Sequence, residues 1–168
     1  MQPWCKTDRP CRGIMPKRSD TTDYPTGRFK AHGNMQLEQS GHLNILKATG
    51  PFNKELVVAA DQAQEPLYEA LLQKVHWGTV LIFCESALAT PDAFEALTAI
   101  LKKRMMQGYT PVAVALVFEP GVEGANLMKS LYLSAYKQAG IDGRVFSDVA
   151  AAKEWVGALI QAKLDAIR

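Results

Sequence analysis

The sequence has no long apolar segment and no pattern of a secretory leader. Its longest uninterrupted apolar stretches, Val80–Cys84 and Val112–Phe118, are far shorter than the about 20 residues that a membrane-spanning helix needs. The first residues carry basic side chains but no apolar segment after them, so we expect no secretory signal and a cytoplasmic location. With 168 residues, of which 48% are hydrophobic, the chain suits one packed domain plus a tail.

Cysteine and histidine are both scarce, with three residues of each. Cys5 and Cys11 lie in a polar N-terminal stretch and Cys84 ends an apolar run, which is no disulfide framework. Cys84 is expected to be a small buried apolar residue. A metal site at Cys5, Cys11 and His32 lacks a fourth ligand and a recognisable spacing. We therefore expect neither a metal nor another cofactor.

Motifs of the common nucleotide-binding and catalytic sites are also missing. No phosphate-binding P-loop is present, no Gly-x-Gly-x-x-Gly follows an apolar run, and no serine lies in a nucleophile elbow. We therefore expect a protein that is not an enzyme. A less favoured alternative is an acid–base pair made by Glu85 and Asp92, which would need a substrate pocket beside it.

The net charge of +2 is unevenly distributed along the chain. Residues 1–34 hold seven Lys/Arg against three Asp, net +4, so the remainder has a net charge of −2. This first stretch is rich in Pro, Gly and polar residues and lacks apolar periodicity, which predicts a flexible basic arm. It has no dense basic run with interleaved aromatics, so the sequence carries no strong nucleic-acid signal. Met15 is a second candidate for the natural start.

Apolar patterning begins near Met35, and residues 35–168 are expected to form the folded domain. Continuous apolar runs predict buried strands, alternation predicts half-buried strands, and apolar residues three or four apart predict helices. The expected strands cover residues 35–39, 42–49, 79–84, 112–118 and 144–146. The expected helices begin at Asn53, at Thr90, after Pro120-Gly121 and at Ser147 or Asp148. Pro66 is expected to kink or divide the first helix.

This order of elements predicts an α/β fold with a single mixed sheet of about five strands and four helices. An N-terminal β-hairpin around Ser40-Gly41 is followed by strand–helix alternation, which requires a mostly parallel sheet with an antiparallel edge strand. Every unit fits into one sheet, so the prediction is one domain without an internal repeat.

Several segments resemble the STAS/SpoIIAA-like superfamily, which is named after sulfate transporters and anti-sigma-factor antagonists. The similar stretches are His42–Gly50, Val80–Cys84, Thr90–Phe94 and Phe146–Trp155, the last of which ends in an Ala-x-x-Trp pattern. The resemblance covers about residues 35–165. It implies a SpoIIAA-like fold and a bacterial regulatory module that works by binding other proteins.

In the antagonist branch of that superfamily, a serine at the start of the helix after the third strand is phosphorylated by a partner kinase. Here the corresponding positions are Thr90-Pro91 or Pro91-Asp92, neither of which is a serine. The resemblance therefore implies a non-enzymatic protein-interaction module without the phosphorylatable serine. Its partner would be a protein or a second copy of the chain.

The expected interaction loop lies between the strand at 79–84 and the next helix, with Glu85, Ser86, Thr90 and Asp92 as contact residues. Thr90 is expected to cap the helix through its side chain, so that Thr90→Ala costs about 1 kcal/mol.

The alternative function is a carrier of a small apolar or lipid-like ligand between helices and sheet, which the resemblance also allows. Aromatic residues on the expected helices are candidate walls of such a pocket, although aromatics at helical spacing are commonly core residues. The principal candidates are Phe94, Tyr132, Tyr136 and Trp155, together with Tyr68 and Trp77.

Overall fold

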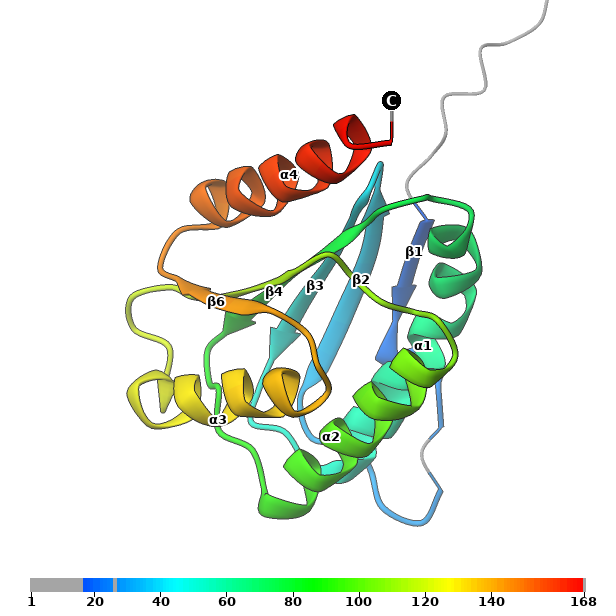
Figure 1. The fold of residues 1–168 in the computed structure, drawn as a ribbon. Coiled ribbons are helices and arrows are strands. Elements are labelled where there is room, and N and C mark those ends of the chain that lie inside the picture. Colours follow the sequence, from blue (N-terminus) through cyan, green and yellow to red (C-terminus); the bar gives the residue numbers. More distant parts are fainter. Residues whose placement is uncertain (1–16, 26, 168) are drawn as a thin grey trace, which may run out of the picture.

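The structure, a computed structural model, describes residues 17–25 and 27–167, which form one mixed six-stranded sheet with four α-helices (Figure 1). In chain order the elements are β1 (Lys17–Asp20), the 3-10 helix η1 (Thr21–Asp23), β2 (Asn34–Ser40), β3 (Leu43–Thr49), α1 (Lys54–Leu72), β4 (Gly78–Cys84), α2 (Pro91–Met106), β5 (Val114–Phe118), α3 (Ala125–Gln138), β6 (Gly143–Phe146) and α4 (Val149–Asp165). The predicted α/β class, hairpin, strand–helix alternation and four helices are confirmed, and the sheet has one strand more than the five expected.

The strands lie side by side in sequence order, β1 to β6. β1 pairs antiparallel with β2 and β2 antiparallel with β3, whereas β3, β4, β5 and β6 are parallel to one another. The register aligns Leu46, Leu81 and Leu116 in one row across the three central strands. Because side chains alternate along a strand, this row points to one face of the sheet and its neighbours point to the other.

Helices cover the two faces unequally. α1, α2 and α3 lie on the face that carries Leu46, Leu81 and Leu116, and α4 lies alone on the opposite face (Figure 1). α4 comes very close to the sheet at Gly78, where a Cβ atom would stand only 2.3 Å from Cγ1 of Val156. A glycine at the start of β4 is therefore what permits this close approach.

The prediction that residues 1–34 form a flexible arm is wrong for the strand Lys17–Asp20 and the turn that follows it. This strand extends the sheet at its edge, and Thr21 behind it is buried. The Thr21 hydroxyl donates to Oδ1 of Asn34 at 2.8 Å and accepts from the Met35 amide at 2.9 Å. A short polar edge strand shows no apolar periodicity, because backbone pairing rather than buried side chains holds it. Residues 1–16 lie outside the described part of the chain.

Two predicted helix caps are confirmed by their hydrogen bonds. Asn53 accepts from the Leu56 amide at 3.1 Å, and Asp148, one of the two candidates at the last helix, accepts from the Ala151 amide at 2.7 Å. Pro66 lies inside α1 without dividing it, so that part of the prediction is wrong. No helix within the described residues is long and apolar enough to cross a membrane.

Candidate functional site

A cavity of about 100 Å³ lies between the sheet and the three helices α1, α2 and α3. We call it the helix-face cavity. Its floor consists of side chains from β3 and β4, namely Leu46, Ala48, Leu81 and Phe83. Its walls come from the three helices and include Leu56, Ala60, Phe94, Leu97, Tyr132 and Tyr136.

The cavity exists because α2 buries fewer of its side chains against the sheet than its neighbour α1 does. Only Ala93 and Arg104 of α2 are buried, and its inward apolar residues, among them Phe94 and Leu97, are half-buried. Small side chains contribute to the unfilled space, since Ala48 lies on the floor and Ala60 on the wall. Protein interiors normally pack with few voids larger than a water molecule, so this space is unusual for a core.

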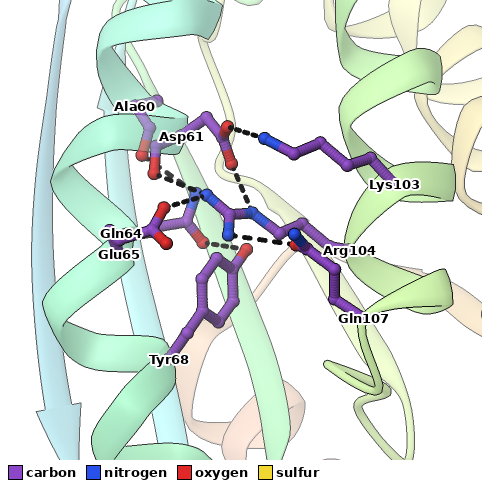
Figure 2. A network of polar contacts seen from close by, with 8 residues as sticks. All are labelled: Ala60, Asp61, Gln64, Glu65, Tyr68, Lys103, Arg104 and Gln107. Carbon is purple, nitrogen blue, oxygen red and sulfur yellow. Dashed lines mark hydrogen bonds and ion pairs between the residues drawn. The ribbon is translucent and has the colours of Figure 1, made fainter.

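A buried cation closes one end of the helix-face cavity. Arg104 is only 3% exposed, yet it carries a full charge on the inner side of α2. Its Nε donates to Oδ1 of Asp61 at 2.7 Å and its Nη2 donates to Oε2 of Glu65 at 2.6 Å, both on α1. Its Nη1 also reaches Oε1 of Gln107 at 3.3 Å (Figure 2). A buried charge needs such partners, because an unpaired one would be strongly destabilised.

Aromatic rings enclose the same guanidinium group. Its carbon atom lies 4.8 Å from the ring centre of Tyr68 and 5.6 Å from that of Tyr109. The Tyr68 hydroxyl donates to Oε1 of Gln64 at 3.0 Å, and burial raises the pKa of this phenol. Tyr68, Gln64 and Tyr109 also line the cavity, so the network forms part of its wall.

The charges of this network cancel. Nζ of Lys103 lies 3.8 Å from Oδ2 of Asp61. The two positive charges of Arg104 and Lys103 are therefore balanced by the two negative charges of Asp61 and Glu65. Burial opposes the charged form of Arg104, but the bonds to Glu65 and Asp61 outweigh it and raise the pKa of the arginine. The hydrogen bond from Arg104 in turn lowers the pKa of Glu65. With two carboxylates already bound, the arginine does not offer a free binding site to an anion.

The structure separates the four principal aromatic residues proposed as pocket walls. Phe94, Tyr132 and Tyr136 line the helix-face cavity, as do Tyr68 and Trp77. Trp155 does not line the cavity, because α4 lies on the opposite face of the sheet. There the centre of the Trp155 ring is 5.5 Å from the centre of the Phe146 ring. Apolar periodicity shows which side of a helix is buried, but not which face of the sheet the helix covers.

The expected interaction loop is exposed at three of its four residues. Glu85, Thr90 and Asp92 face solvent, whereas Ser86 is 4% exposed and its Oγ accepts from the Leu88 amide at 3.3 Å. Thr90 occupies the N-cap position of α2, as predicted, but its side chain makes no capping bond. Its hydroxyl donates instead to the carboxylate of Asp92. The predicted side-chain cap is therefore wrong, because the Thr90 oxygen, whose proton is directed to Asp92, accepts no hydrogen bond from an amide of the first turn.

Neighbouring loops hold this segment on both sides. The Phe52 amide donates to the carbonyl of Leu88 at 2.8 Å, and the Ala87 amide donates to the carbonyl of Glu123 at 2.8 Å. The Glu123 amide donates back to the carbonyl of Glu85 at 2.8 Å. Glu85 has a φ of +60°, in the left-handed region that side chains other than glycine rarely adopt. The loop is thus held by backbone bonds on both sides and is locally strained at Glu85.

A second hollow of about 500 Å³ lies at the carboxyl ends of the parallel strands, beside the start of α3. Open α/β sheets commonly bind ligands at this edge. Its lining includes Phe118, Glu119, Gly121, Gly124, Asn126 and Lys129, but neither Glu85 nor Asp92. The acid–base pair considered from the sequence therefore does not lie in a described pocket.

Cys84 is half-buried rather than fully buried as expected, and burial raises the pKa of its thiol. Within residues 17–25 and 27–167, no three His, Cys, Asp or Glu side chains are placed so that they could hold a metal ion. Cys5 and Cys11, two of the candidate ligands, lie outside those ranges.

Comparisons with known protein families, curated proteins and solved structures found no match to this chain. The resemblance to the STAS/SpoIIAA-like superfamily stays a prediction.

Proposed function

We propose that this chain is a non-enzymatic binding domain that holds a small, uncharged, apolar molecule in the helix-face cavity. The observation that carries the proposal is the space itself, which is lined by apolar side chains and bordered by a few polar groups at one end. A well-formed apolar pocket with few polar groups is the usual form of a small-molecule site.

The size of the cavity limits the ligand. An engineered apolar cavity of about 150 Å³ binds benzene, and the helix-face cavity is somewhat smaller at about 100 Å³. We therefore expect ligands no larger than about one aromatic ring. A lipid chain would require α2 to move away from α1, and the bonds of Arg104 to Asp61 and Glu65 oppose this movement.

The charge of the cavity also limits the ligand. Arg104 lines the cavity and could in principle pair with an anionic ligand, but its N–H groups already donate to Asp61 and Glu65. A carboxylate ligand would enter an apolar space without a partner and would lose its hydration. The proposed ligand is therefore neutral.

A titration with benzene tests the proposal, with chemical shifts of methyl and aromatic groups as the readout. We expect saturable shifts at Leu97 and Phe94 in the wild-type protein. The variant Ala60→Leu places a larger side chain in the cavity wall and should abolish binding. The exposed position Ala99 offers a matched control on α2, since Ala99→Leu makes the same exchange outside the cavity.

Two results would oppose this proposal. The first is an absence of any saturable shift in the wild-type protein. The second is a folded Ala60→Leu variant that binds benzene as well as the wild type, because binding would then take place elsewhere.

A second candidate function is protein binding through the loop from Glu85 to Asp92. It is favoured by the fixed conformation of this loop, since a pre-organised surface loses little entropy on binding. Quantitative co-purification can compare the wild type with a Glu85→Lys/Asp92→Lys double variant. A partner that binds through the loop should be lost from this variant and retained by Glu154→Lys on α4. Equal recovery from all three proteins would remove this candidate.

A further inference from the structure

Asn44 in β3 carries a buried polar atom without a partner. The side chain is 1% exposed, and its carbonyl oxygen Oδ1 makes no hydrogen bond with any described residue. A buried acceptor that loses water without gaining a donor is destabilised by about 1–3 kcal/mol. Buried polar atoms without a hydrogen-bond partner are rare in proteins, so this oxygen is unusual.

Asn44 is not itself among the residues that line the helix-face cavity, but its neighbours on the sheet are. Leu46, two residues further along β3, lines the cavity floor and points to the same face of the sheet. Thr79, which pairs with Asn44 across the β3–β4 ladder, also lines the cavity. Neighbouring strands of a sheet lie about 4.8 Å apart. Asn44 thus adjoins the floor along its own strand and across the sheet.

Two acceptors that line the cavity, Asp61 and Gln64, are already engaged. The carboxylate of Asp61 accepts from Arg104, and Oε1 of Gln64 accepts from the Tyr68 hydroxyl. An amide oxygen can only accept a hydrogen bond. Among the described residues, Oδ1 of Asn44 is the one buried side-chain oxygen or nitrogen atom without a hydrogen-bond partner, and a donor would satisfy it.

We propose that the ligand of the helix-face cavity is an alcohol or phenol, whose hydroxyl group donates a hydrogen bond to Oδ1 of Asn44. This inference rests on the proposed function and adds the chemical class of the ligand. The ring or short carbon chain occupies the apolar space, and the hydroxyl lies at the edge next to Thr79. Carboxylates of similar molecules are excluded, since an ionised carboxyl group only accepts hydrogen bonds and would face the Asn44 oxygen without a donor.

The test compares phenol with benzene as probes of the full chain, because they differ by one hydroxyl group. In the wild type we expect phenol to bind about tenfold more tightly than benzene, as one hydrogen bond to a buried acceptor allows. In Asn44→Leu, which keeps the branched shape of the side chain but is larger, we expect benzene binding to persist and the preference for phenol to disappear. Benzoate should bind to neither protein.

The neighbouring hydroxyl provides the matched control. Thr79→Val removes the other polar group of this pair while keeping the shape of the side chain, and it should retain the preference for phenol. A second readout needs no variant, because phenol should shift the side-chain amide signal of Asn44 in the wild type more than benzene does. Asn44→Leu should also raise the midpoint of thermal unfolding, since it removes the unpaired oxygen.

The outcomes separate the two proposals. If phenol and benzene bind equally to the wild type, or if Asn44→Leu keeps the preference, the inference about Asn44 is wrong while the cavity remains a binding site. Loss of the preference in Thr79→Val but not in Asn44→Leu would assign the hydroxyl contact to Thr79 and would overturn the inference. If no probe binds, the proposed function itself fails.

Discussion

Nε of Arg104 in α2 lies 2.7 Å from Oδ1 of Asp61 in α1, and this contact joins the two helices at one end of the helix-face cavity (Figure 2). The same arginine reaches Glu65 one turn further along α1. Because α2 otherwise buries little apolar surface, these bonds are a principal reason that it stays against α1.

The first prediction concerns this contact. Arg104→Met should destabilise the fold by about 2–3 kcal/mol, because Asp61 and the surrounding groups lose a buried partner. Lys103→Met is the matched control, since Lys103 is 57% exposed and lies 3.8 Å from Asp61. This exposed pair should contribute less than about 1 kcal/mol. Urea unfolding of both variants measures the difference, and equal losses would contradict the assigned role of Arg104.

The second prediction concerns acid. The bond from Arg104 lowers the pKa of Glu65 below its ordinary 4.5 in the folded state. A carboxyl group with a lowered folded-state pKa adds stability that is present above pH 4.5 and is lost as the pH falls through the folded-state pKa. Glu65→Gln should therefore flatten the acid side of the stability profile and leave its slope near neutral pH unchanged. An acid slope identical to that of the wild type would show that Glu65 is not coupled to Arg104.

The third prediction concerns the strained residue at the end of β4. Glu85 has a φ of +60°, so Glu85→Gly should stabilise the fold by about 0.5–1 kcal/mol. Glu123 in the adjoining loop has no such conformation, and Glu123→Gly should destabilise by about the same amount. Chemical denaturation gives the sign of each change. A loss of stability in both variants would indicate that Glu85 carries no backbone strain.

The fourth prediction compares two helix starts. Thr90→Ala should cost well under 1 kcal/mol, since its side chain does not cap α2. Asn53→Ala should cost at least about 1 kcal/mol, because the Asn53 oxygen accepts from the amides of Leu56 and His32, and its amide donates to the carbonyl of Lys30. Thermal unfolding of the two variants should give this order, and the reverse order would contradict it.

The central strands were predictable because their residues are apolar on both faces. The expected strands at 79–84 and 112–118 correspond to β4 (Gly78–Cys84) and β5 (Val114–Phe118) within two residues at each end. A strand covered by helices on both sides needs such a continuous run, so local composition was sufficient. The edge strand β1 has no comparable signal, because β2 holds it through the backbone.

The site was less predictable because it depends on contacts between distant segments. Arg104 belongs to a run with Lys102 and Lys103 that is typical of an exposed helix end, and only the approach of Asp61 from α1 accounts for its burial. The four-residue spacing of Asp61 and Glu65 places two carboxylates on one face of a helix, which was the available signal for a basic partner. Asn44 gives no such signal in the sequence, since its neighbours across the sheet decide whether its oxygen is paired.

The most direct measurement is a crystal structure of the wild-type protein grown with benzene. We expect a bound ring in the helix-face cavity, in contact with Leu81, Leu97 and Tyr136, with the bonds between Arg104 and Asp61 intact. A cavity that is filled by its own side chains and holds no benzene would show that it is not a binding site.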